Sequence, residues 1–160
     1  MTFSSIKRKP KMGFDDIKTE IQKAIKRLQL NDEKILRDGL EWAFSHRLAV
    51  YLEYAFSGWD VDCEYTREGS QGDSKTNSQG KRKRPDVIIH RRWQSNKDDN
   101  LLVIELKFKN DDGNDDAKLR EFTSKPKGER EFQYQYGLAL SFKPALMLKW
   151  YENGQEIPDC

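Results

Sequence analysis

Three charged residues interrupt two apolar stretches in the middle of the chain. Asp86 opens the stretch Val87–Ile89, whereas Glu105 and Lys107 close the stretch Leu101–Ile104. Successive side chains of a β-strand point to opposite faces, so Glu105 and Lys107 share one face. If the two stretches pair as neighbouring strands, all three charged side chains gather in one place.

This arrangement suits a divalent cation. Carboxylates that lie close together repel each other and are costly to remove from water, and a bound cation offsets that cost. Mg²⁺ fits the residue types because it takes oxygen ligands, keeps several waters and commonly meets phosphate groups. The predicted cofactor is therefore Mg²⁺, which Mn²⁺ could replace.

The spacing of these residues resembles a known signature. Pro85-Asp86, eighteen intervening residues and then Glu105-Leu106-Lys107 resemble the motif of the PD-(D/E)XK nuclease superfamily, which has the restriction-endonuclease-like fold. The order of elements from about Asp38 to Phe142 is also similar to that superfamily's core of a helix, three strands, a helix and a further strand. The resemblance implies an α/β fold with a central mixed sheet flanked by helices, plus an N-terminal helix and an extra C-terminal strand.

The resemblance also implies a role for each residue. Asp86 and Glu105 would bind the metal, and Lys107 would position the attacking water or stabilise developing charge on phosphate. Many members add a glutamate from the helix before the first core strand, and Glu41 stands near the start of that helix here. Glu41 is therefore predicted to join the catalytic residues and the metal ligands. The implied reaction is hydrolysis of DNA phosphodiester bonds.

Each of these residues has a structural interpretation as well. Asp86, Glu105 and Lys107 could form a strand-end salt bridge of little net benefit. A glutamate in the first turn of a helix, such as Glu41, is favoured by helix propensity and by the macrodipole. We favour the site because its charges interrupt stretches that are otherwise apolar.

A cationic segment precedes Asp86. Its side chains would lie beside the site and are predicted to hold a nucleic-acid backbone, with a solvated loop as the alternative. They are Lys75, Lys81, Arg82, Lys83 and Arg84. A later acidic cluster opposes this charge and is predicted to be solvated surface; it comprises Asp111, Asp112, Asp115 and Asp116.

Composition limits the remaining classes. With 160 residues, 35% of them charged, we expect one domain in which 1–37 is a basic segment with an amphipathic helix and 38–160 is the nuclease-like core. No apolar stretch is long enough to cross a bilayer and the basic start does not resemble a secretory signal, so we expect a soluble, cytoplasmic protein without a membrane partner. Cys63, Cys160, His46 and His90 form no zinc pattern. Phosphate-loop, dinucleotide-binding and serine-hydrolase motifs are also missing from the sequence.

Apolar periodicity predicts the elements that must position the site. Helices are expected over 14–30, 40–56 and 117–123. Strands are expected over 59–65, 87–89, 101–104, 134–142 and 145–151. The polar segment 67–83 is predicted to be a mobile loop, and 152–160 a turn with a frayed tail.

Two other functions remain open from the sequence. A catalytically inactive module could keep this fold to bind nucleic acid or protein, because a fold does not guarantee a function. A purely structural or interaction subunit could dock a partner through segment 67–83. DNA is the favoured partner, and cutting both strands of a duplex would be simplest for a homodimer.

Overall fold

The computed structural model describes residues 11–39, 41–63, 67–68, 73–74, 84–94, 96–107, 114–128, 132–142 and 145–158. The helices are α1 (Phe14–Asn31), α2 (Glu33–Asp38), α3 (Glu41–Ala55), the 3-10 turn η1 (Lys97–Asp99) and α4 (Asn114–Thr123). The strands are β1 (Asp60–Cys63), β2 (Arg67–Glu68), β3 (Asp73–Ser74), β4 (Val87–His90), β5 (Asn100–Lys107), β6 (Tyr136–Ser141), β7 (Met147–Glu152) and β8 (Gln155–Ile157). Within these ranges, every helix is too short or too polar to span a membrane.

A mixed sheet forms the centre of the fold. Its six strands follow the order β1-β4-β5-β6-β7-β8, in which β5 and β6 run parallel and the other neighbours run antiparallel. Parallel neighbours need a crossover connection, and α4 lies on the chain between β5 and β6. The predicted α/β class with a central mixed sheet is therefore confirmed.

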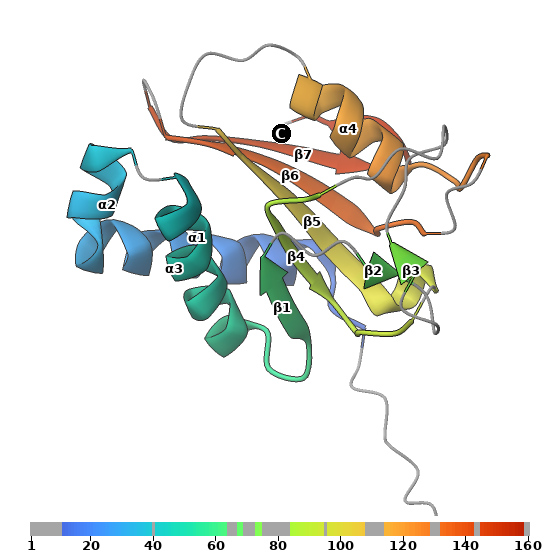
Figure 1. The fold of residues 1–160 in the computed structure, drawn as a ribbon, viewed down its shortest axis with the longest axis horizontal. Coiled ribbons are helices and arrows are strands. Elements are labelled where there is room, and N and C mark those ends of the chain that lie inside the picture. Colours follow the sequence, from blue (N-terminus) through green and yellow to red (C-terminus); the bar gives the residue numbers. More distant parts are fainter. Residues whose placement is uncertain are drawn as a thin grey trace, which may run out of the picture.

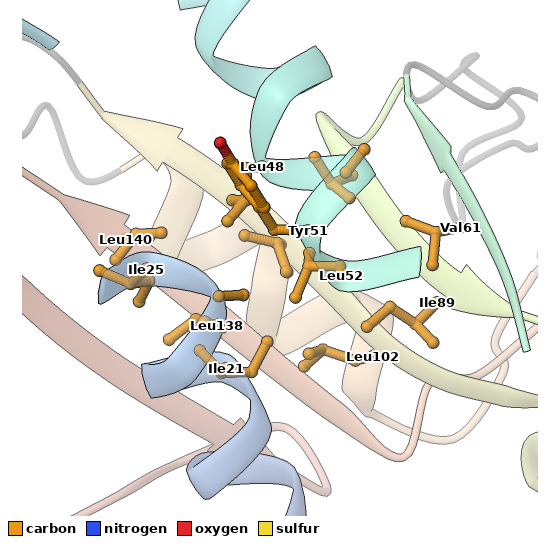
Figure 2. Packing of buried hydrophobic residues seen from close by; sticks show 14 of the residues in the cluster. Ile21, Ile25, Leu48, Tyr51, Leu52, Val61, Ile89, Leu102, Leu138 and Leu140 are labelled. Atoms are coloured by element: carbon orange, nitrogen blue, oxygen red, sulfur yellow. The ribbon is translucent and has the colours of Figure 1, made fainter. Parts of the chain in front are cut away.

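Helices cover both faces of this sheet. Helices α1 and α3 lie on one face and α4 lies on the other (Figure 1). Successive side chains of β5 point to opposite faces of the sheet. Leu102 and Ile104 belong to the hydrophobic cluster with α1 and α3, whereas Val103 belongs to the cluster with α4. Figure 2 shows the larger cluster, in which side chains of α1 and α3 meet those of the strands.

Helix α1 is built into this core. Its buried residues recur at helical spacing and are Ile17, Ile21, Ala24, Ile25 and Leu28. The helix begins after Gly13, whose N–H donates to Asp16 Oδ2 at 3.3 Å, and it ends where the Asp32 N–H donates to Leu28 O at 2.9 Å. Segments 1–37 and 38–160 therefore contribute to one hydrophobic cluster, because α1 shares it with α3 and the sheet.

Two local predictions differ from the structure. Segment 152–160 was expected to be a turn followed by a frayed tail; the turn is present at Asn153-Gly154, but the residues after it form β8, which extends the sheet. The connecting residues Asn153 and Gly154 have φ values of 50° and 77°, and Asn-Gly is the residue pair that a two-residue hairpin turn of this kind favours. Segment 67–83 was expected to be a loop, yet β2 and β3 pair within it; its other residues lie outside the described ranges.

Candidate active site

The structure brings the predicted residues of β4 and β5 together. Val87 pairs with Ile104, and continuing this register by one residue places Asp86 opposite Glu105. The Leu106 N–H donates to Asp86 Oδ2 at 2.8 Å, which anchors the Asp86 carboxylate at the end of the strand pair. Because Val103 faces α4, the alternating positions Glu105 and Lys107 face α4 as well.

Helix α4 supplies an opposite charge to each of the two β5 residues. Lys118 Nζ lies 2.8 Å from Glu105 Oε1, and Asp115 Oδ2 lies 3.4 Å from Lys107 Nζ. The Lys118 ammonium also donates to the backbone carbonyl of Arg84 at 3.3 Å. The cluster thus holds three acidic and two basic side chains, which leaves one negative charge when all are ionised.

Sequence reasoning missed Asp115 and Lys118, although a signal was present. Asp115, Lys118 and Phe122 fall at i, i+3 and i+7 of α4, so they share the face that meets the sheet. The predicted solvated acidic cluster is wrong at two positions. Asp115 pairs with Lys107, and Asp116 accepts hydrogen bonds from Tyr151 and Arg120. The other two members, Asp111 and Asp112, lie outside the described residues.

The carboxylate of Glu105 is the most buried polar group of the site. Its side chain is 3% exposed. Lys118 Nζ lies 2.8 Å from Oε1 of this carboxylate and is its charge partner. Burial of a carboxylate costs free energy even when a cation is its partner, and functional sites often retain such a cost.

The pKa values of the two carboxyl groups reflect this environment. Burial raises the pKa of Glu105 well above its ordinary value, and the nearby charge of Asp86 adds to the shift, whereas Lys118 opposes it. Burial also raises the pKa of Asp86, against the lowering effects of the Leu106 amide, Lys118 and a hydrogen bond with Glu105. Neighbouring carboxyl groups with shifted pKa values are typical of catalytic and ion-binding sites, though structural ion pairs also produce them.

The side chains present fit a magnesium site in which water completes the coordination. Mg²⁺ is commonly held by one or two carboxylates while it keeps several waters, and Asp86 and Glu105 offer such a pair. Glu105 Oε1 could serve as a ligand atom once the Lys118 ammonium, which lies 2.8 Å from it, moves away. No group of three or more His, Cys, Asp or Glu side chains is placed to hold a metal within the described ranges.

Glu41 is accordingly not brought into a group of three ligands with Asp86 and Glu105. It is exposed in the first turn of α3, one turn before the buried Phe44. Helix α3 lies on the sheet face opposite α4 (Figure 1), whereas Glu105 and Lys107 point toward α4. The assisting role of Glu41 stays a prediction.

Of the residues predicted to contact nucleic acid, the structure describes one, Arg84. Arg84 is exposed immediately before Pro85 and Asp86, while Lys75, Lys81, Arg82 and Lys83 lie outside the described residues. Farther along β4, His90 is buried, and its Nε2 lies 2.7 Å from Asp62 Oδ2. His90 therefore belongs to a structural contact with Asp62 away from the candidate site.

Comparison of the chain with protein-family models, curated proteins and solved structures found no match. The functional argument consequently depends on the chemistry of the cluster. Two desolvated carboxyl groups can bind a hard cation, and an ammonium two residues along the same strand face can stabilise an anion beside it.

Proposed function

We propose that this chain is a metal-dependent nuclease that hydrolyses DNA phosphodiester bonds. The observation that carries the proposal is the meeting of Asp86 and Glu105 on paired strands, where the Glu105 side chain is only 3% exposed. Lys107 lies on the same strand face as Glu105. A phosphate group bound there would meet both a cation site and an ammonium.

The order of elements supports a restriction-endonuclease-like core. From α3 through β1, β4, β5 and α4 to β6, the main sheet and its helices follow the sequence helix, three strands, helix, strand. The antiparallel group β1-β4-β5 and the parallel β6 leave Asp86 and Glu105 at one end of neighbouring strands. This is the arrangement that the motif resemblance implies.

Each residue has a proposed task. Asp86 and Glu105 would hold Mg²⁺, which when bound would neutralise their charge and polarise a phosphate oxygen. Lys107 would leave Asp115 to orient the attacking water or to balance charge that develops on phosphate. In the reaction a water oxygen bonds to phosphorus, the bond from phosphorus to one ester oxygen breaks, and that oxygen leaves with a proton.

A second candidate function is a catalytically inactive module that binds nucleic acid or protein. The observation that favours it is the Lys118 ammonium, which lies 2.8 Å from the oxygen that would bind the metal. A permanent ion pair there would neutralise Glu105 without a metal. Such a module would bind its partner equally well in Mg²⁺ and in EDTA.

Cleavage of linear, supercoiled and branched DNA separates these candidates. We expect cutting in Mg²⁺ or Mn²⁺ and none in EDTA, with a loss of roughly 100-fold or more in Glu105→Ala and in Lys107→Ala. Lys127→Ala removes an exposed lysine and should cut like the wild type. A protein that cuts none of these substrates, or that still cuts after double substitution of Asp86 and Glu105, is not the proposed nuclease.

A further inference from the structure

The first turns of α4 carry charges that oppose those of β5. Strand β5 presents Glu105 and Lys107 on one face. Helix α4 places Lys118 beside Glu105 and Asp115 beside Lys107. We propose that Lys118 is a built-in counter-cation that competes with a divalent metal for Glu105, so that metal binding requires its ammonium to withdraw. This inference rests on the metal site of the proposed function and adds a means of regulating it.

Competition follows from the distances. Lys118 Nζ lies 2.8 Å from Glu105 Oε1, and Mg²⁺ bound to the same oxygen would lie about 2.1 Å from it. The two cations would then be within about 5 Å of each other, where charges of the same sign repel strongly in a poorly hydrated place. Glu105, at 3% exposure, has little room to turn toward solvent and serve both.

Lys118 has somewhere to go when it leaves Glu105. Its side chain is 18% exposed, in contrast to the enclosed carboxylate. It also contacts the backbone carbonyl of Arg84 at 3.3 Å, and Arg84 is exposed. A lysine side chain is long and flexible, so a small rotation can keep the carbonyl contact while the ammonium moves toward water.

The contact also explains how the metal-free protein tolerates its carboxylates. With Lys118 on Glu105 and Lys107 on Asp115, the unbalanced charge is that of Asp86, which accepts the Leu106 amide. A buried charge with a partner costs less than one without. The internal cation would therefore lower the affinity for metal and also reduce, without removing, the cost of the buried Glu105 carboxylate in the metal-free protein.

Calorimetric titration of the full chain with Mn²⁺, without DNA, tests the competition. Lys118→Met keeps an unbranched apolar stem and removes the ammonium, and we expect it to bind Mn²⁺ on the order of tenfold more tightly than the wild type. Lys127→Met makes the same charge change at an exposed lysine and should bind like the wild type. Lys118→Gln repeats the test with a polar side chain if the methionine variant fails to fold.

The outcomes separate this inference from the proposed function. Tighter Mn²⁺ binding by the Lys118 variants supports the competition even if none of the proteins cuts DNA. Equal or weaker binding by these variants overturns it even if the wild type is a nuclease. Failure of every variant to bind Mn²⁺ at millimolar concentration removes the metal site and the competition together.

Discussion

Substitution of Glu105 by glutamine separates a functional carboxylate from a structural one. Glutamine keeps the size of the side chain but removes its charge. The side chain is 3% exposed, and its pKa is raised well above the ordinary value by burial and by the charge of Asp86, even though Lys118 lies 2.8 Å away. Ionised Glu105 is therefore a cost to the fold in the metal-free protein, and Glu105→Gln should be more stable.

The expected gain is about 1 to 2 kcal/mol, within the range of single stabilising substitutions. For a chain of this size, each 1 kcal/mol corresponds to a rise in melting temperature of roughly 2 to 4 °C. Lys118 does not cancel the gain because its side chain is 18% exposed and it can turn to solvent or toward Asp86. Loss of a buried partner that held the fold would instead cost about 3 to 5 kcal/mol.

The assay is urea unfolding in EDTA, followed by far-UV circular dichroism. The sign of the pH dependence follows from the raised pKa of Glu105: the wild type loses stability as the pH rises above 4.5, the ordinary value, and through the higher folded value. The advantage of Glu105→Gln should therefore be full at high pH and shrink as the pH falls toward 4.5. Glu53→Gln, at an exposed position on α3, should change stability by less than about 0.5 kcal/mol.

A clear loss of stability in Glu105→Gln at neutral pH would refute the reasoning. It would show that the Lys118 to Glu105 ion pair is a net support of the fold. The charges would then be better explained as a structural salt bridge than as a metal site.

Two further predictions concern the scaffold. Burial alone would raise the pKa of Asp62, but hydrogen bonds from His90 and Arg92 outweigh it and lower the pKa to about 2; Asp62→Asn should cost about 1 to 3 kcal/mol in urea unfolding at neutral pH. The stabilisation by ionised Asp62 is full above pH 3.8 and is lost as the pH falls through about 2. A stability difference between wild type and Asp62→Asn that stays constant down to pH 2 would contradict the lowered pKa of Asp62. Gly137→Ala places a Cβ 3.2 Å from Leu119 Cδ2 in the packing of β6 against α4, and it should lower stability by about 1 to 3 kcal/mol. A thermal melt that matches the wild type would show that α4 can shift away from the sheet.

Much of the fold follows from local patterns in the chain. The apolar spacing of 14–30 predicted α1 almost to the residue, because a helix that packs on one side must repeat its apolar residues every three or four positions. The short apolar runs around Ile88 and Val103 predicted buried strands for a similar reason. The hairpin of β7 and β8 could also have been predicted from the sequence, since Asn153-Gly154 favours a two-residue hairpin turn.

Other features depend on distant parts of the chain. The predicted strand 101–104 extends over Asn100–Lys107 because β4 and β6 pair along β5 and α4 covers its charged end. No local pattern states that Lys118 meets Glu105, since Lys118 lies thirteen positions farther along the chain and on a different element. The burial of Glu105 likewise arises only when α4 packs on the sheet.

Local sequence thus determined that Glu105 and Lys107 share a strand face and that Asp86 opens a buried strand, because side-chain alternation is a property of the extended backbone itself. Only the tertiary structure decided that Asp86 stands opposite Glu105 and that Asp115 and Lys118 occupy the space above them. Strand order, strand register and the position of α4 on the sheet are set by which apolar surfaces pack against each other. The same packing removes water from the carboxylates. This loss of water raises the pKa of Glu105, which makes the cluster a candidate for chemistry.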